Sequence, residues 1–167
     1  IRQESSRHTQ LLYEFIKKKY RADYYKWTEK QRVNFLSKHL KTNKKIIKYF
    51  KFKNRENLEV WSTFKILADQ PEECLGAYII SMTSSASDIL AVSFLQKEAN
   101  INKRLRVVPL FETLDDLKNA KSIMENLFSL SWYRKLIKNN HEIMIGYSDS
   151  SKDAGKLSAS WHQYKLQ

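Results

Sequence analysis

The chain has few of the residues that mark several protein classes. Its 167 residues include three glycines and two prolines, which excludes collagen-like and linker-rich chains. The single cysteine, Cys74, excludes an internal disulfide framework and a multi-cysteine zinc site, and it favours a reducing compartment. No apolar run approaches the roughly 20 residues that a membrane-spanning helix needs. With 42% hydrophobic residues, the chain is long enough for one domain with a hydrophobic core.

The positive charge is concentrated in the first third of the chain. The formal net charge is +12, and residues 1–55 carry 17 basic and 4 acidic side chains. Eight of these basic residues lie between Lys38 and Arg55, where three aromatic rings but no acidic residue occur. Two interpretations remain open: a nucleic-acid-binding patch with stacking rings, or a solvated, lysine-rich segment that joins two structured parts. The second is favoured, because no nucleic-acid-binding motif accompanies the basic segment.

Three short apolar runs predict strands buried on both faces, as in a parallel sheet. They are Gly76–Met82, Leu105–Phe111 and Glu142–Tyr147, and their starts are 29 and 37 residues apart. This spacing leaves room for a helix between successive strands, which is typical of an α/β protein. Pro109 lies within the second run and weakens the case for regular pairing there, since proline cannot donate a ladder hydrogen bond.

Helical spacing of apolar side chains predicts three helices in the first part of the chain, over Arg7–Tyr20, Glu29–Leu40 and Asn54–Ala68. Three further helices are predicted after the strands, each by a Ser or Thr with an Asp three residues later, a pattern typical of a helix N-terminus. These pairs are Ser85 with Asp88, Thr113 with Asp116, and Ser150 with Asp153. The chain is therefore a helix-rich α/β protein by its pattern alone.

Polar side chains follow the apolar runs, where α/β proteins of this kind place their chemistry. Glu112 follows the second predicted strand, and Asp149 and Lys152 follow the third. Arg2 is expected at the end of a strand that lies mostly before it. Two carboxylates on one edge suit Mg²⁺ or Mn²⁺, and the lysine and arginine suit a phosphate or carboxylate. The plainer alternative stays open: Glu112 and Asp153 stabilise helix N-termini, and Lys152 faces solvent.

Six segments resemble, in the same order, motifs of the phosphoenolpyruvate carboxylase family. The longest is IMIGYSDSSKDAG, over Ile143–Gly155, which resembles the family's lysine-containing motif. The others are IRQESSRH at Ile1–His8, LGAYIIS at Leu75–Ser81, LRVVPLFETL at Leu105–Leu114, FSLSWYR at Phe128–Arg134 and SASWHQYK at Ser158–Lys165. The resemblance runs from Ile1 to Gln167 and is weakest near residues 40–56.

The resemblance implies an irreversible carboxylation of phosphoenolpyruvate with bicarbonate to oxaloacetate and phosphate, which replenishes the tricarboxylic acid cycle. It also implies Mg²⁺ or Mn²⁺ as cofactor and a cytoplasmic, allosteric homotetramer whose fold is a (β/α)8 barrel with added helices. By motif matching, Glu112 and Asp149 are metal ligands, Lys152 is the active-site lysine, Arg2 binds phosphate and Met144 lines the substrate pocket. Ser151 departs from the Gly or Ala common in the family's motif.

The resemblance also implies that residues 1–167 are an internal part of one barrel domain, with 38–56 as a basic, variable surface segment. The family's histidine motif, of the TAHPTE/Q type, and its glycine- and arginine-rich mobile loop do not occur in this sequence. This portion alone is therefore expected to be inactive. The alternative of a basic nucleic-acid-binding module on a non-catalytic α/β core stays open at this point.

Overall fold

The computed structural model describes residues 1–47, 49–101, 104–138 and 140–166. The first half contains β1 (Arg2–Glu4), α1 (Ser5–Tyr20), the short 3-10 helix η1 (Tyr24–Lys26), α2 (Glu29–Leu40), α3 (Arg55–Ala68) and a second 3-10 helix, η2 (Glu72–Cys74). The second half contains β2 (Ala77–Ser81), α4 (Ala86–Glu98), β3 (Arg106–Phe111), α5 (Leu114–Phe128), α6 (Ser131–Leu136), β4 (Met144–Ile145), α7 (Tyr147–Ala154) and α8 (Lys156–Leu166). The helix-rich α/β prediction is confirmed.

The four strands form one parallel sheet in the order β1-β2-β3-β4, so each strand lies beside its successor along the chain. Helices connect every pair of strands, as parallel pairing requires. Pro109 lies inside β3 opposite Ile80 of β2, whereas β4 pairs with β3 only from Leu110 onward. The proline is therefore accommodated where β3 has one strand neighbour.

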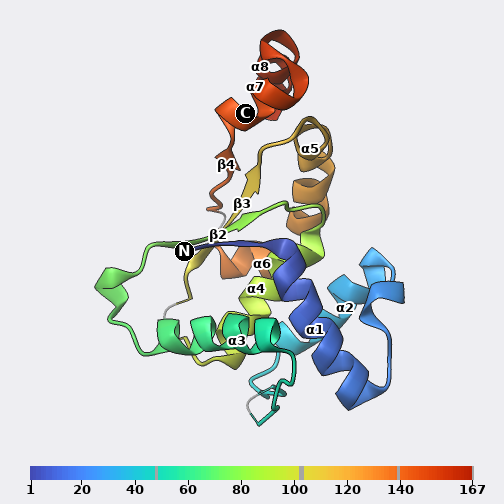
Figure 1. The fold of residues 1–167 in the computed structure, drawn as a ribbon, viewed down its shortest axis with the longest axis vertical. Helices are drawn as coiled ribbons and strands as arrows, with labels where there is room; N and C mark the ends of the chain where they lie inside the picture. The colour runs from blue at the N-terminus through green and yellow to red at the C-terminus, as the bar shows by residue number, and fades with distance from the viewer. Residues whose placement is uncertain (48, 102–103, 139, 167) are drawn as a thin grey trace.

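Most of the helices lie together on one side of the sheet, whereas α7 and α8 lie at the far end of the molecule from α3 (Figure 1). Helix α4 is the centre of the helical layer: every one of its residues is buried, and it packs against α1, α2, α3 and α5. Its middle part, Ile89–Leu95, is apolar apart from Ser93, as such a central position favours. In the part of the chain that the structure describes, no helix has the length and apolarity needed to cross a bilayer.

Two of the three predicted helix N-termini are confirmed. Thr113 and Asp116 form reciprocal hydrogen bonds at the start of α5, as do Ser85 and Asp88 at the start of α4. The pair of Ser150 and Asp153 is wrong, because α7 begins earlier, at Tyr147, and the Ser150 hydroxyl donates to the Gly146 carbonyl within that helix.

The two faces of the sheet have different surroundings. Side chains alternate between the faces along a strand, and directly paired residues share a face. Tyr78, Ile80 and Phe111 lie on the face that packs into the main hydrophobic core with the helices. Val108 and Leu110 lie on the opposite face, buried but outside that core. The sheet therefore separates the helix-covered core from a second face.

The basic segment between α2 and α3 is anchored, although its lysines are mostly exposed. Ile47 and Phe52 are buried in the main core. The Glu98 carboxylate of α4 accepts hydrogen bonds from the backbone N–H groups of Ile46 and Ile47 at 2.6 and 2.7 Å. The Glu14 carboxylate of α1 accepts another from Lys53 N–H at 2.7 Å. The solvated segment that we expected is therefore fixed to the domain through its apolar side chains and its backbone.

Hydrogen bonds determine the protonation of Glu14. Partial burial would raise the pKa of its carboxyl group, but hydrogen bonds from Asn57, Lys18 and two backbone N–H groups outweigh that effect and lower the pKa to about 2. The carboxylate is therefore charged at neutral pH. A lowered folded-state pKa stabilises the fold above the unfolded value near 4.5, and this contribution disappears as the pH falls toward 2.

Replacing Glu98 by alanine is expected to release the basic segment, because two buried backbone N–H groups lose a charged acceptor. Each such bond contributes about 1.5–3 kcal/mol, so we expect a local destabilisation of about 3 kcal/mol. The measurement is limited trypsin proteolysis of the full-length protein. Mass spectrometry would give the rates of cleavage after Lys44, Lys51 and Lys53, which we expect to rise in Glu98→Ala. The control is Glu125→Ala, since Glu125 is exposed on α5. Equal cleavage rates in the two variants would contradict the anchoring.

Candidate functional site

Arg2 and Glu112 meet on the sheet face opposite the main core. Arg2 pairs in register with Ile79 of β2, and Glu112 follows the last residue of β3. The Arg2 guanidinium donates to both oxygens of the Glu112 carboxylate, at 3.3 and 3.1 Å. The Glu112 side chain is 11% exposed and that of Arg2 is 56% exposed. An arginine has five N–H donors, so this contact leaves the exposed guanidinium able to bind a further anion.

Glu112 is oriented by the helix that follows it. Asp116 of α5 accepts hydrogen bonds from the backbone N–H groups of Glu112 at 3.2 Å and Thr113 at 3.0 Å. These bonds belong to the N-terminus of α5, so the predicted helix start also fixes the direction of the chain at Glu112.

Gly146 brings the end of β4 against Glu112. Its N–H donates to the carbonyl of Phe111 at 2.9 Å, which continues the pairing of β3 with β4. A Cβ at this position would lie 2.6 Å from the Glu112 Cβ and 3.1 Å from its Cα, closer than side chains pack. Only glycine fits this approach without a shift of one strand, so Gly146 sets the distance between Glu112 and α7.

Asp149 and Lys152 lie three positions apart on α7 and are both exposed. Side chains with this spacing lie on neighbouring positions of one helix surface. The helix is tied back to the rest of the fold by Asp153, whose carboxylate accepts from Leu114 N–H at 2.8 Å. It is also tied to α8 by Gln163, whose amide donates to the Ser150 hydroxyl at 2.7 Å. Asp153 therefore does not pair with Ser150, but its carboxylate lies at a helix N-terminus, that of α5, and joins α7 to α5.

The structure thus brings together two of the predicted site residues, Arg2 and Glu112, and places the other three on β4 and α7. Among the described residues, Asp149 and Lys152 make no hydrogen bond or ion pair with Arg2 or Glu112. Met144 lies in β4 opposite Leu110, on the same sheet face as Arg2, and is 37% exposed. No three or more His, Cys, Asp or Glu side chains cluster as a metal cage within the part of the chain that the structure describes.

A buried series of hydrogen bonds involves Gln3, the residue after Arg2. No sequence pattern predicted it. The Tyr78 hydroxyl donates to the Gln3 side chain at 2.6 Å and lies 2.9 Å from His8 Nε2. Burial, helped by the charge of Arg7, lowers the pKa of His8 to about 3, so the ring is neutral at physiological pH. These contacts join α1, β2 and β1 and hold Gln3, the neighbour of Arg2, in place.

Comparison with known proteins gives one family over the whole chain. The model of the family described as phosphoenolpyruvate carboxylase matches residues 1–167. The phosphoenolpyruvate carboxylase of Acinetobacter baylyi is 49% identical over 174 residues, which are 100% of this chain and 20% of the relative. That of Aliivibrio salmonicida is 48% identical over 98% of this chain and 19% of the relative. The C4 phosphoenolpyruvate carboxylase of Flaveria trinervia is 48% identical over 100% of this chain and 17% of the relative. The chain spans about a fifth of the length of these relatives.

Proposed function

The chain belongs to the phosphoenolpyruvate carboxylase family, and on this premise we propose that it is part of an enzyme that carboxylates phosphoenolpyruvate with bicarbonate. The observation that carries the proposal is the contact between Arg2 and Glu112 on the second face of the sheet. It pairs a group that binds anions with a group that binds cations, as transfer of a phosphoryl group requires. The nucleic-acid-binding alternative has no support from the comparisons.

We propose that the sheet is part of an eight-stranded parallel barrel. The strand order supports this, because each parallel strand lies beside its successor and helices connect them. The two faces support it as well, since in such a barrel one face packs on the helices and the other lines the interior. Glu112 and Asp149 then follow the carboxyl ends of neighbouring strands, the edge at which barrel enzymes place their sites.

Mg²⁺ or Mn²⁺ is the proposed cofactor, with Glu112 and Asp149 as the residues that would hold it. The donor set fits, because Mg²⁺ usually takes one or two carboxylates together with substrate oxygens and water. The low exposure of Glu112 also fits, since a partly desolvated carboxylate favours a cationic partner, which Arg2 provides in this structure. When bound, the ion would neutralise phosphate charge and stabilise the enolate oxygen.

The proposed reaction has two steps. A bicarbonate oxygen attacks the phosphorus, and the bond from phosphorus to the enol oxygen breaks, which gives carboxyphosphate and the enolate of pyruvate. Carboxyphosphate then loses phosphate, and the methylene carbon of the enolate bonds to the carbon dioxide released, which gives oxaloacetate. Arg2 would hold the phosphoryl oxygens and Lys152 would offset their negative charge, while Met144 would exclude water from the reactive enolate.

The test is oxaloacetate formation by the full-length enzyme that contains this segment. Rates are measured with phosphoenolpyruvate alone, then with bicarbonate and Mg²⁺ added singly and together. We expect product only when both additions are present, in a ratio of one phosphate to one oxaloacetate. Phosphate release without oxaloacetate, from a folded enzyme supplied with both, would overturn the assignment.

From the family we further propose that the full-length protein is a cytoplasmic homotetramer under allosteric control. Its proposed role is to replenish the tricarboxylic acid cycle.

A further inference from the structure

A pocket lies at the opposite end of β3 from Glu112. We call it the α4–α6 pocket. It is lined by Ser93 and Gln96 of α4, by residues 104–107, by Tyr133, Leu136, Ile137 and Lys138 in and after α6, and by residues 140–142. Its volume is about 540 Å³. It adjoins Arg106, the first residue of β3, so six residues of strand, or about 20 Å, separate it from Glu112.

Part of the pocket wall is apolar. Leu105 and Val107 are each 8% exposed, and Leu136 and Ile137 form the side toward α6. Gln96 holds Leu105 in place, because its side-chain amide accepts from Leu105 N–H at 2.7 Å and donates to Leu105 C=O at 3.2 Å. Such a cavity would accept an apolar molecule of moderate size.

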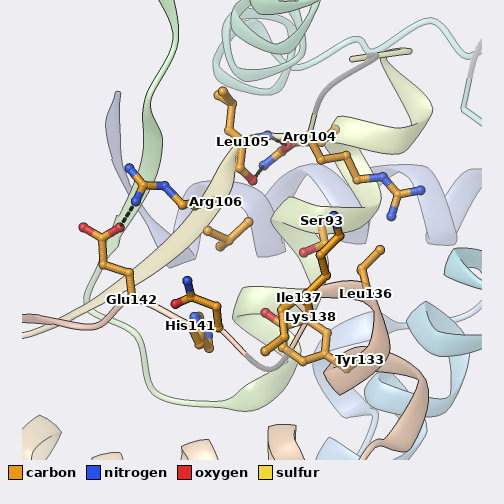
Figure 2. A pocket seen from close by; sticks show the side chains of 13 residues that line it. Ser93, Arg104, Leu105, Arg106, Tyr133, Leu136, Ile137, Lys138, His141 and Glu142 are labelled. Atoms are coloured by element: carbon orange, nitrogen blue, oxygen red, sulfur yellow. Dashed lines mark hydrogen bonds and ion pairs between the residues drawn. The ribbon is translucent and has the colours of Figure 1, made fainter. Parts of the chain in front are cut away.

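The cations of the pocket exceed its anions. Arg106 forms an ion pair with Glu142 at 2.7 Å, and Figure 2 shows this pair at one end of the pocket and Arg104 at the other. Neither Arg104 nor Lys138 has an ion-pair partner among the residues that the structure describes. Both cations are exposed residues, and partial burial lowers the pKa of Arg104. An anion in the pocket would offset the two unpaired cations.

Two further polar groups at the pocket lack a partner. The Tyr133 hydroxyl is accessible from the pocket, although the residue as a whole is 2% exposed, and it makes no hydrogen bond within the described ranges. His141 Nε2 is buried and has no hydrogen-bond partner there either. A buried polar atom without a partner, such as His141 Nε2, costs about 1–3 kcal/mol, so it usually marks a bound molecule or water.

We propose that the α4–α6 pocket binds a small organic anion that carries one carboxylate or phosphate group on an apolar body. The anionic group would pair with Arg104 and Lys138 and accept from the Tyr133 hydroxyl. The apolar body would lie against Leu105, Val107 and Ile137. This binding is separate from the carboxylation chemistry, because the pocket shares no residue with the site at Arg2 and Glu112.

The test measures binding to the full-length protein by calorimetry. The probes are phenyl phosphate and phenylacetate, which distinguish a phosphate from a carboxylate ligand. Inorganic phosphate tests charge alone and benzyl alcohol tests the apolar ring alone. Two variants remove one polar group each and keep most of the side chain's bulk: Arg104→Met and Tyr133→Phe. The control is Lys121→Met, which removes an exposed charge on α5.

We expect at least one organic anion to bind about tenfold more tightly than benzyl alcohol and than inorganic phosphate. Arg104→Met should weaken that binding about tenfold and Tyr133→Phe about fivefold, whereas Lys121→Met should leave it unchanged. Absence of binding up to about 10 mM would overturn the proposal, and so would binding that is unchanged in both pocket variants. The second outcome includes binding at the phosphoenolpyruvate site, which these substitutions do not touch.

Discussion

Replacement of Asp149 by asparagine or of Lys152 by methionine is expected to lower kcat for the proposed carboxylation by the full-length protein at least about hundredfold. The asparagine keeps the size of the side chain but removes the charge proposed to hold Mg²⁺. The methionine keeps most of the length of the lysine side chain but removes the charge proposed to offset the phosphoryl oxygens. Both native side chains are exposed and without an ion pair among the described residues, so stability should be nearly unaffected.

The measurement is steady-state oxaloacetate formation over a range of Mg²⁺ concentrations. Asp149→Asn should also raise the Mg²⁺ concentration needed for half-maximal rate, whereas Lys152→Met should not. The controls are Asp115→Asn and Lys118→Met, because these residues are exposed on α5 and, among the described residues, form a weak ion pair only with each other. Retention of more than about a tenth of the wild-type rate in either site variant would exclude that residue from the proposed roles.

Replacement of Gly146 by alanine is expected to impair both activity and stability. The new methyl carbon would lie 2.6 Å from the Glu112 Cβ and 3.1 Å from its Cα, so the obstacle includes backbone that cannot rotate away. Either β4 or the end of β3 must move, and overpacking of this kind costs about 1–3 kcal/mol. A displacement of about 1 Å between Glu112 and α7 would separate the proposed metal ligands and lower kcat about hundredfold.

The matched control for this variant is Gly76→Ala. Gly76 directly precedes β2, and a Cβ there would meet nothing within 4 Å. Thermal unfolding and kcat of the full-length enzyme would be measured for both variants. Wild-type values are expected for Gly76→Ala, and wild-type kcat in Gly146→Ala would show that the contact with Glu112 does not set the site geometry.

Local sequence patterns were sufficient to predict most of the helices and strands. Helix α2 covers the predicted Glu29–Leu40, and α3 begins one residue after the predicted Asn54, which accepts the first hydrogen bonds of that helix. The third predicted strand, Glu142–Tyr147, is reduced to Met144–Ile145 in the structure. Its composition favours a longer strand, but Gly146 and Tyr147 already belong to the start of α7, so a neighbouring element overrides the local preference.

The site depends on contacts that no spacing encodes. Polar residues that follow the strands could be expected at one edge of the sheet, because parallel strands end at one edge. The pairing of Arg2 with Glu112 joins positions 110 residues apart and follows from the sheet register, which the sequence does not reveal. The sequence also does not reveal the roles of the buried Gln96 and Tyr133 at the α4–α6 pocket, because both resemble other core positions in a helix.

The way Glu14 and Glu98 fix the basic segment has a consequence for how this region can evolve. Both carboxylates hold the segment through its backbone N–H groups, which every residue except proline possesses. Exchange of the exposed lysines for other residues therefore leaves the path of the chain unchanged while it alters the surface charge. Drift in charge is tolerated here, and a proline at Ile46, Ile47, Lys53 or Asn54 is the replacement that selection should remove.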